Sequence, residues 1–184
     1  MWAGDMSRPV EPVSVQLLTS LFSPEKELIG RAGHELSEIY GPVDWVGPEM
    51  FFDRTTYYAR EMGWPLHRRI LAFKNLIRPE SLVDVKLGTN RMEQRYIEDG
   101  RRRINIDPGY ICPERLILAT GKNYTHRIYL SKGIYADLTL IFHKGSFRPL
   151  AWTYRDYADP DMIAHFNELR RRYMEALRER NHVD

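Results

Sequence analysis

The spacing of hydrophobic residues changes several times along the chain, and each change marks the border of a predicted element. Residues 13–22 alternate apolar and polar positions in the manner of a strand. The next segment repeats its apolar residues at helical intervals, which predicts a helix with Ser23 as its N-cap and Gly41 just beyond its last turn. The expected buried stripe of this helix is Leu28, Ala32, Leu36 and Ile39.

The middle of the chain is rich in aromatic and β-branched residues. Residues 51–77 predict a hairpin that is interrupted by a Gly-Trp-Pro turn and has its second strand at 66–77. Residues 79–99 have apolar side chains at helical spacing and predict one helix that Gly100 ends, although their first half also alternates like a strand. One helix, or a strand followed by a helix, both remain open for this segment.

The last part of the chain is mostly β, with short apolar runs between glycines and prolines. The predicted strands are 101–107, 115–120, 126–131, 134–143 and 146–154. Lys144 and Gly145 predict the tip of a hairpin. Asp159 as N-cap and Pro160 as first residue predict a C-terminal helix. Its expected buried stripe is Ile163, Phe166, Leu169 or Arg170, Tyr173 and Leu177.

This order of elements predicts an α+β fold, a mostly antiparallel sheet with the helices packed on one face. The first six elements follow the β-α-β-β-α-β order of a ferredoxin-like core, after which come β-hairpins and a C-terminal helix. A length of 184 residues fits one domain. We expect this domain to cover residues 13–180, preceded by a flexible N-terminal arm at residues 1–12.

Composition narrows the class of protein. Hydrophobic residues make up 43% and charged residues 28% of the chain, as in ordinary globular proteins. Cys112 is the single cysteine, the N-terminus lacks the apolar segment of a signal peptide, and no apolar run is long enough to cross a membrane. We therefore expect a soluble, cytoplasmic protein. The net charge of +2 does not by itself point to a nucleic-acid partner.

Several long motifs resemble one known family. They are FFDRTTYYAREMG (51–63), KLGTNRMEQRY (86–96), NIDPGYI (105–111), LATGKNYTHRIYL (118–130), GIYADLTL (133–140) and WTYRDY (152–157). On these motifs the chain is similar, over most of its length, to domain of unknown function 4416, a family of uncharacterised prokaryotic proteins. The resemblance implies little about function, although some relatives carry the label GTP-binding.

The chain lacks the standard nucleotide-binding loop. A P-loop requires G-x-x-x-x-G-K-[ST], because glycines curve the backbone around the phosphates and the hydroxyl reaches magnesium. Around Gly121 and Lys122 the first glycine is replaced by Leu116 and the hydroxyl residue by Asn123. HExxH zinc motifs and G-x-S-x-G nucleophile elbows do not occur either. A nucleotide site would therefore have to be of another kind.

Polar residues next to buried runs outline a candidate site. One face of the predicted second helix carries Lys86, Thr89 or Asn90, and Glu93. Asn105 and Asp107 alternate with isoleucines, which places them together on the polar face of a strand. The further candidates are Lys122, His126, Arg127 and Asp137.

The same residues also have simpler explanations. The helix face with Lys86 and Glu93 is also typical of a solvated, salt-bridged surface. Asp107 can belong to an Asp-Pro-Gly turn, and His126 can be a satisfied core residue that follows a hairpin turn at 121–124.

Our leading hypothesis is a site for a phosphate-bearing small molecule such as a nucleotide, with a divalent cation such as magnesium as the candidate cofactor. The expected ligand-binding residues are Lys86, Asn90, Asn105, Lys122, Arg127 and Asp137. If the protein is a phosphohydrolase, the expected catalytic residues are Asp107, His126 and Glu93. The alternatives are an RNA-binding module that uses the arginine triplets at 101–103 and 170–172, and a non-catalytic assembly subunit.

Overall fold

The structure is a computed structural model that describes residues 8–51, 62–63 and 65–181. Its strands are β1 (Val15–Ser23), β2 (Val43–Val46), β3 (Met50–Phe51), β4 (His67–Ile77), β5 (Ile97–Glu98), β6 (Arg101–Arg102), β7 (Asn105–Ile111), β8 (Arg115–Thr120), β9 (Arg127–Ser131), β10 (Ile134–His143) and β11 (Ser146–Pro149). Its helices are α1 (Lys26–Tyr40), the short 3-10 helix η1 (Pro79–Ser81), α3 (Leu82–Arg95) and α4 (Pro160–Asn181).

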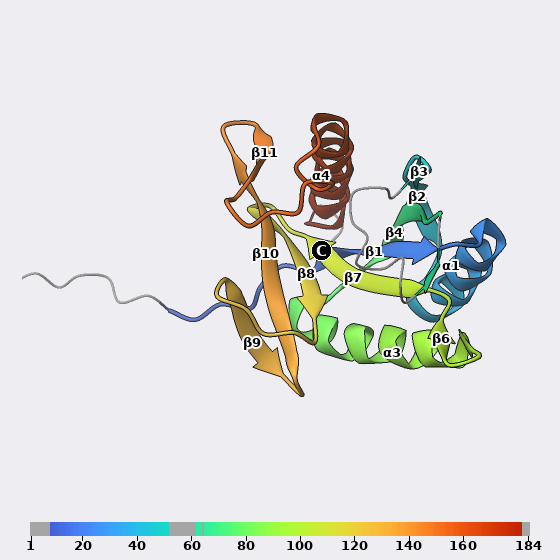
Figure 1. The fold of residues 1–184 in the computed structure, drawn as a ribbon. Coiled ribbons are helices and arrows are strands. Elements are labelled where there is room, and N and C mark those ends of the chain that lie inside the picture. The colour runs from blue at the N-terminus through green and yellow to red at the C-terminus, as the bar shows by residue number, and fades with distance from the viewer. Residues whose placement is uncertain (1–7, 52–61, 64, 182–184) are drawn as a thin grey trace, which may run out of the picture.

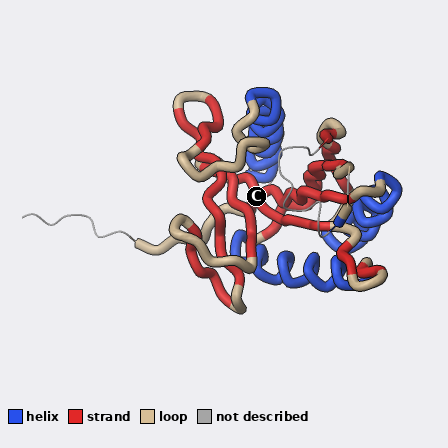
Figure 2. Tube along the Cα trace, viewed as in Figure 1, coloured by secondary structure: helices blue, strands red, loops and turns tan. Residues whose placement is uncertain are grey.

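Within the described residues, nine strands form one antiparallel sheet, while β5 and β6 form a small separate ribbon. The order across the sheet is β11-β10-β8-β7-β1-β4-β2, with β3 beside β4 and β9 beside β10. The predicted α+β class is therefore confirmed (Figures 1 and 2). The ferredoxin-like arrangement of the first part of the chain stays a prediction.

Helices cover both faces of the sheet, which corrects the expectation that they lie on one face. Figure 1 shows α4 on the side opposite to α3. In β1, Leu17 packs into the core that contains residues of α1 and α3, whereas Leu18 packs into the core that contains residues of α4. Because successive side chains of a strand point to opposite faces, two covered faces leave all of β1 buried.

The first helix begins later than predicted. Ser23 is the last residue of β1, and its hydroxyl accepts a hydrogen bond from the backbone N–H of Glu25 at 3.0 Å, so α1 starts only at Lys26. At the other end, Gly41 follows the helix with φ +97°, as expected for a residue that leaves a helix in the left-handed region. The predicted burial of Ile39 is wrong, since this side chain is 61% exposed.

The segment at 79–99 begins with η1 and continues as α3, but α3 ends at Arg95 instead of reaching Gly100. The ribbon of β5 and β6 follows, so the strand predicted at 101–107 is divided between β6 and β7. Of the hairpin predicted at 51–77, β3 and β4 pair in antiparallel register. Residues 52–61 and Trp64 lie outside the described residues.

The C-terminal elements agree closely with the sequence pattern. Lys144 and Gly145 turn the β10–β11 hairpin with φ values of +49° and +82°, although β11 ends at Pro149 and not at residue 154. Asp159 caps α4, because its carboxylate accepts the N–H of Asp161 at 3.0 Å. In the predicted stripe Phe166, Leu169 and Tyr173 are buried, and Ile163 and Leu177 are partly buried.

Two turns that the sequence allows do not form, because tertiary pairing overrides local preference. Asp107-Pro108-Gly109 is not a turn but the middle of β7, paired with β1. The segment at 121–124 does not close a hairpin, because β8 and β9 both pair with β10 and not with each other. Gly109 is needed where it stands, since a Cβ there would lie 2.3 Å from the carbonyl oxygen of Ile117.

Candidate ligand-binding site

Strands β7 and β8 are neighbours in the sheet, but they pair over only part of their length. Residues 109–111 of β7 pair with β8, whereas residues 105–107 pair with β1 alone. The change occurs at Pro108, which has no N–H to offer to a neighbouring strand. Beyond this point the edge of β7 is open toward the end of β8.

Two side chains of α3 satisfy the backbone of β7 where its pairing with β8 stops. Glu93 Oε1 accepts a hydrogen bond from the N–H of Ile106 at 2.6 Å, and Lys86 Nζ donates to the carbonyl oxygen of Ile106 at 3.1 Å. Buried backbone groups that lack a partner are costly, so these two bonds stabilise the open edge. They also hold two charged side chains in the gap between the strands.

This gap contains a cavity of about 640 Å³, which is lined by residues of α3, β7, β8, the loop after β8 and the segment before α4. The structure brings eight of the nine candidate residues to its wall. They are Lys86, Asn90, Glu93, Asn105, Asp107, Lys122, Arg127 and Asp137.

The charges of the wall are arranged as cation–carboxylate pairs. Lys86 Nζ lies 3.1 Å from Asp107 Oδ1, and Asn105 Nδ2 donates to Asp107 Oδ2 at 2.7 Å. A second pair joins Arg102 to Glu93 at 3.1 Å. These groups are largely buried, because the side chains of Lys86 and Glu93 are 8% and 9% exposed.

Arg127, which also lines the cavity, fixes the loop that follows β8. Its guanidinium donates to Asp137 Oδ2 and to the carbonyl oxygen of Lys122, both at 2.9 Å, and to the hydroxyl of Tyr154 at 2.8 Å. Burial raises the pKa of Tyr154 above its usual value, with the nearby Arg127 charge opposing the change. Arg127 therefore joins β9, β10 and the segment before α4 around one rim of the cavity.

His126 is the one candidate that does not line the cavity. Its Nε2 lies 3.3 Å from Asp137 Oδ2, and its ring stacks on Trp152 with the centroids 5.0 Å apart. His126 and Arg127 both contact the carboxylate of Asp137. His126 is thus placed to position Asp137 and does not itself face a ligand in the cavity.

Glu93 is the candidate whose titration the structure changes most clearly. Burial raises the pKa of its carboxyl above the usual value, and this outweighs the opposing effects of Lys86, the Ile106 N–H and Arg102. A carboxyl whose pKa is raised by burial keeps its proton to a higher pH than a solvated carboxyl, and such raised pKa values are common among general acids and bases. Its hydrogen bond to Ile106 also gives Glu93 a structural role.

The sequence interpretation missed a group of residues behind one wall. Asp156 and Tyr157 line the cavity, and Arg68 of β4 forms an ion pair with Asp156 while its guanidinium lies between the rings of Phe22 and Tyr157. Burial raises the pKa of Tyr157 to about 12. The signal in the sequence was an arginine inside the apolar run that forms β4. The structure shows that the side chain of Arg68 is only 1% exposed, which is rare for an arginine.

The surroundings of the cavity do not match a P-loop or a standard metal centre. The loop with Gly121 and Lys122 leads into β9 and not into a helix, as a P-loop would. In the part of the chain that the structure describes, no three His, Cys, Asp or Glu side chains gather as ligands for a metal ion.

Fold and cavity together define an α+β protein with a charge-lined cavity at the divergence of two sheet strands. The chain belongs to the family described as a domain of unknown function (DUF4416), whose sequence pattern matches residues 13–173. Neither a curated protein nor a solved structure matches it. Among the described residues, the helices are too short or too polar to span a membrane.

Proposed function

We propose that the protein binds a phosphate-bearing small molecule, such as a nucleotide, in the cavity between β7 and β8. The observation that carries this proposal is the set of hydrogen-bond donors that surround the cavity. Lys86 has three N–H groups, and two are used by Ile106 and Asp107. Arg127 has five, of which three bind Asp137, Lys122 and Tyr154.

The remaining donors suit a ligand rich in acceptor oxygens. Lys86 and Arg127 are held in place by carboxylates, which fixes the direction of their unused N–H groups, and Lys122 adds a third cation to the wall. Such preorganised, charge-assisted donors are typical of phosphate sites. A volume of about 640 Å³ is within the range of small-molecule sites.

The proposal includes two further points, a phosphohydrolase activity at the cavity and a ferredoxin-like arrangement of the strands and helices around it. Glu93, with its raised pKa, and Asp107 would be the acid–base groups of a phosphohydrolase at this cavity, with His126 acting through Asp137. The strand order β7-β1-β4-β2, with α1 and α3 sharing one core, supports a ferredoxin-like arrangement of the part of the chain that carries the site.

The RNA alternative has weaker support, because carboxylates neutralise much of both arginine triplets. Arg102 and Arg103 pair with Glu93 and with Glu25 and Glu98, respectively. In α4, Arg171 pairs with Glu168 and Glu175, and Arg172 with Asp44. For the assembly alternative, the apolar stripe of α4 covers the protein's own sheet.

A thermal unfolding screen tests the proposed ligand class. A nucleoside triphosphate at about a hundredfold excess over its Kd should raise the free energy of unfolding by about 2.7 kcal/mol. For a chain of this size this corresponds to a rise in Tm of roughly 5–10 °C. The parent nucleoside is the matched control and should have little effect, because it lacks the phosphates. If inorganic pyrophosphate, nucleotides and sugar phosphates all leave Tm unchanged at millimolar concentration, with and without magnesium, the proposal is wrong.

A further inference from the structure

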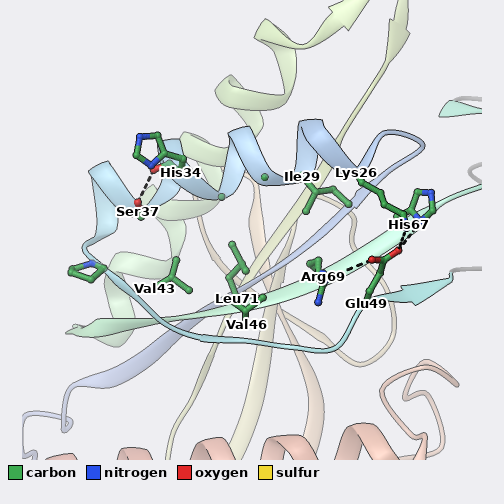
Figure 3. A pocket seen from close by; sticks show the side chains of 13 residues that line it. Lys26, Ile29, His34, Ser37, Val43, Val46, Glu49, His67, Arg69 and Leu71 are labelled. Carbon is green, nitrogen blue, oxygen red and sulfur yellow. Dashed lines mark hydrogen bonds and ion pairs between the residues drawn. The ribbon is translucent and has the colours of Figure 1, made fainter.

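A second cavity, of about 600 Å³, lies between α1 and the sheet and shares no lining residue with the first (Figure 3). One face of α1 forms one wall, because its lining residues recur at intervals of three and four. They are Lys26, Ile29, Gly30, Gly33, His34 and Ser37. The other wall includes alternate residues of β4, which share one face of the strand. They are His67, Arg69 and Leu71.

Two glycines of α1 line this cavity. Glycine is, after proline, the least favourable residue in a helix interior, so the presence of glycine at positions 30 and 33 needs an explanation. At Gly33 packing supplies one, because a Cβ would lie 3.1 Å from Leu71 Cδ1. At Gly30 a Cβ would meet nothing within 4 Å in the described structure. The missing side chain at Gly30 therefore keeps the cavity open and relieves no contact.

The two parts of the cavity differ in polarity. Its middle is apolar, with Ile29 on the helix and Val43, Val46 and Leu71 on the strands, as Figure 3 shows. At one end, basic side chains gather around the carboxylate of Glu49. Lys26 Nζ lies 2.5 Å from Glu49 Oε1, while His67 Nδ1 lies 3.4 Å from Oε1 and Arg69 Nη2 lies 3.4 Å from Oε2.

Among the described residues, this end gathers three basic side chains around one carboxylate. Lys26, His67 and Arg69 all lie within ion-pair distance of Glu49. Glu49 shows that the cluster accepts a carboxylate group, and its side chain is 29% exposed, so it lies at the rim of the cavity. A second carboxylate entering from the cavity would find two cations at the end of an apolar channel.

We propose that this second cavity binds an unbranched aliphatic monocarboxylate, with the carboxylate at Lys26 and Arg69 and the alkyl chain between α1 and β4. The inference does not depend on the proposed phosphate ligand, since the two cavities have separate walls. The apolar middle supplies affinity through burial of methylene groups, and the basic end selects an anion over a neutral or cationic head group.

A calorimetric titration of the full chain tests the site with hexanoate, octanoate and octanol. Each added methylene should tighten binding about fourfold, the factor that corresponds to about 0.8 kcal/mol per buried CH₂. Octanol should bind more weakly than octanoate. Glu49→Gln should tighten octanoate binding about tenfold and leave octanol unchanged, because it removes the competing carboxylate. A gain of affinity of this kind cannot result from misfolding.

Substitutions at Gly30 test the position of the alkyl chain. Gly30→Leu places a side chain in the open space and should abolish binding of both octanoate and octanol, whereas Gly30→Ala should keep octanoate binding within about threefold. Thermal unfolding of both variants checks that they are folded. The proposal is overturned if octanoate does not bind at millimolar concentration, if Glu49→Gln weakens or does not change its affinity, or if folded Gly30→Leu binds it like the wild type.

Discussion

Replacing Arg68 with methionine should lower the free energy of unfolding by about 3–5 kcal/mol, the range found when one partner of a buried ion pair is removed. Arg68 is 1% exposed and donates to Ser20 Oγ at 2.9 Å in addition to its pair with Asp156. Methionine fills much of the same volume, but it leaves Asp156 without its counterion next to the cavity. Urea unfolding measures the loss.

The double variant Arg68→Met/Asp156→Asn is the decisive control. The Nη2 nitrogen of Arg68 is buried without a hydrogen-bond partner among the described residues. The ion pair therefore offsets only part of the free energy that burying its two charges costs. Removing both charges should therefore recover most of the stability, to within about 1–2 kcal/mol of the wild type. If the double variant loses as much free energy of unfolding as the two single variants together, an unpaired buried charge is not the cause of the loss in Arg68→Met.

Replacing Glu93 with leucine should lower the free energy of unfolding by about 1–3 kcal/mol, because the N–H of Ile106 would lose the acceptor that Glu93 provides at the open edge of β7. Arg102 would lose its carboxylate as well. Glu93→Gln keeps an amide oxygen for the Ile106 N–H and should cost less than about 1 kcal/mol. Equal losses in the two variants, measured by urea unfolding, would argue that this hydrogen bond does not support the edge.

The wild type and the Glu93→Gln variant together give a pH test of Glu93. Because burial raises its pKa in the folded state above 4.5, the native protein holds the proton more tightly than the unfolded chain does. The contribution to stability is therefore complete below pH 4.5 and is lost as the pH rises through the higher native pKa. The stability of the wild type relative to Glu93→Gln should accordingly fall as the pH rises through this window, and a constant difference would contradict the raised pKa.

Local periodicity explains why much of the site could be predicted from the sequence. Lys86, Asn90 and Glu93 share a helix face, and Asn105 and Asp107 share a strand face, and neither relation depends on the rest of the fold. Their convergence needed only that α3 packs against β7. The structure shows that it does, through Lys86 and Glu93.

Features that depend on contacts between distant segments could not be predicted in this way. The Asp-Pro-Gly segment has a strong turn preference, but pairing of β7 with β1 extends it into a strand. The position of α4 on the second face places Asp156 and Tyr157 at the cavity and requires Arg68 behind them. No spacing along the chain relates β4 to a segment that lies so far from it in sequence.

The most direct test of the account compares two lysine variants in a calorimetric titration with the phosphate compound that stabilises the wild type most. Lys122 lines the cavity, whereas Lys74 is exposed on β4 outside its lining, so Lys122→Met and Lys74→Met remove the same charge from different places. The account predicts that Lys122→Met weakens binding about tenfold, as expected for the loss of one charge-assisted contact, and that Lys74→Met changes it less than about twofold. Equal affinities of the two variants would contradict a phosphate site between β7 and β8.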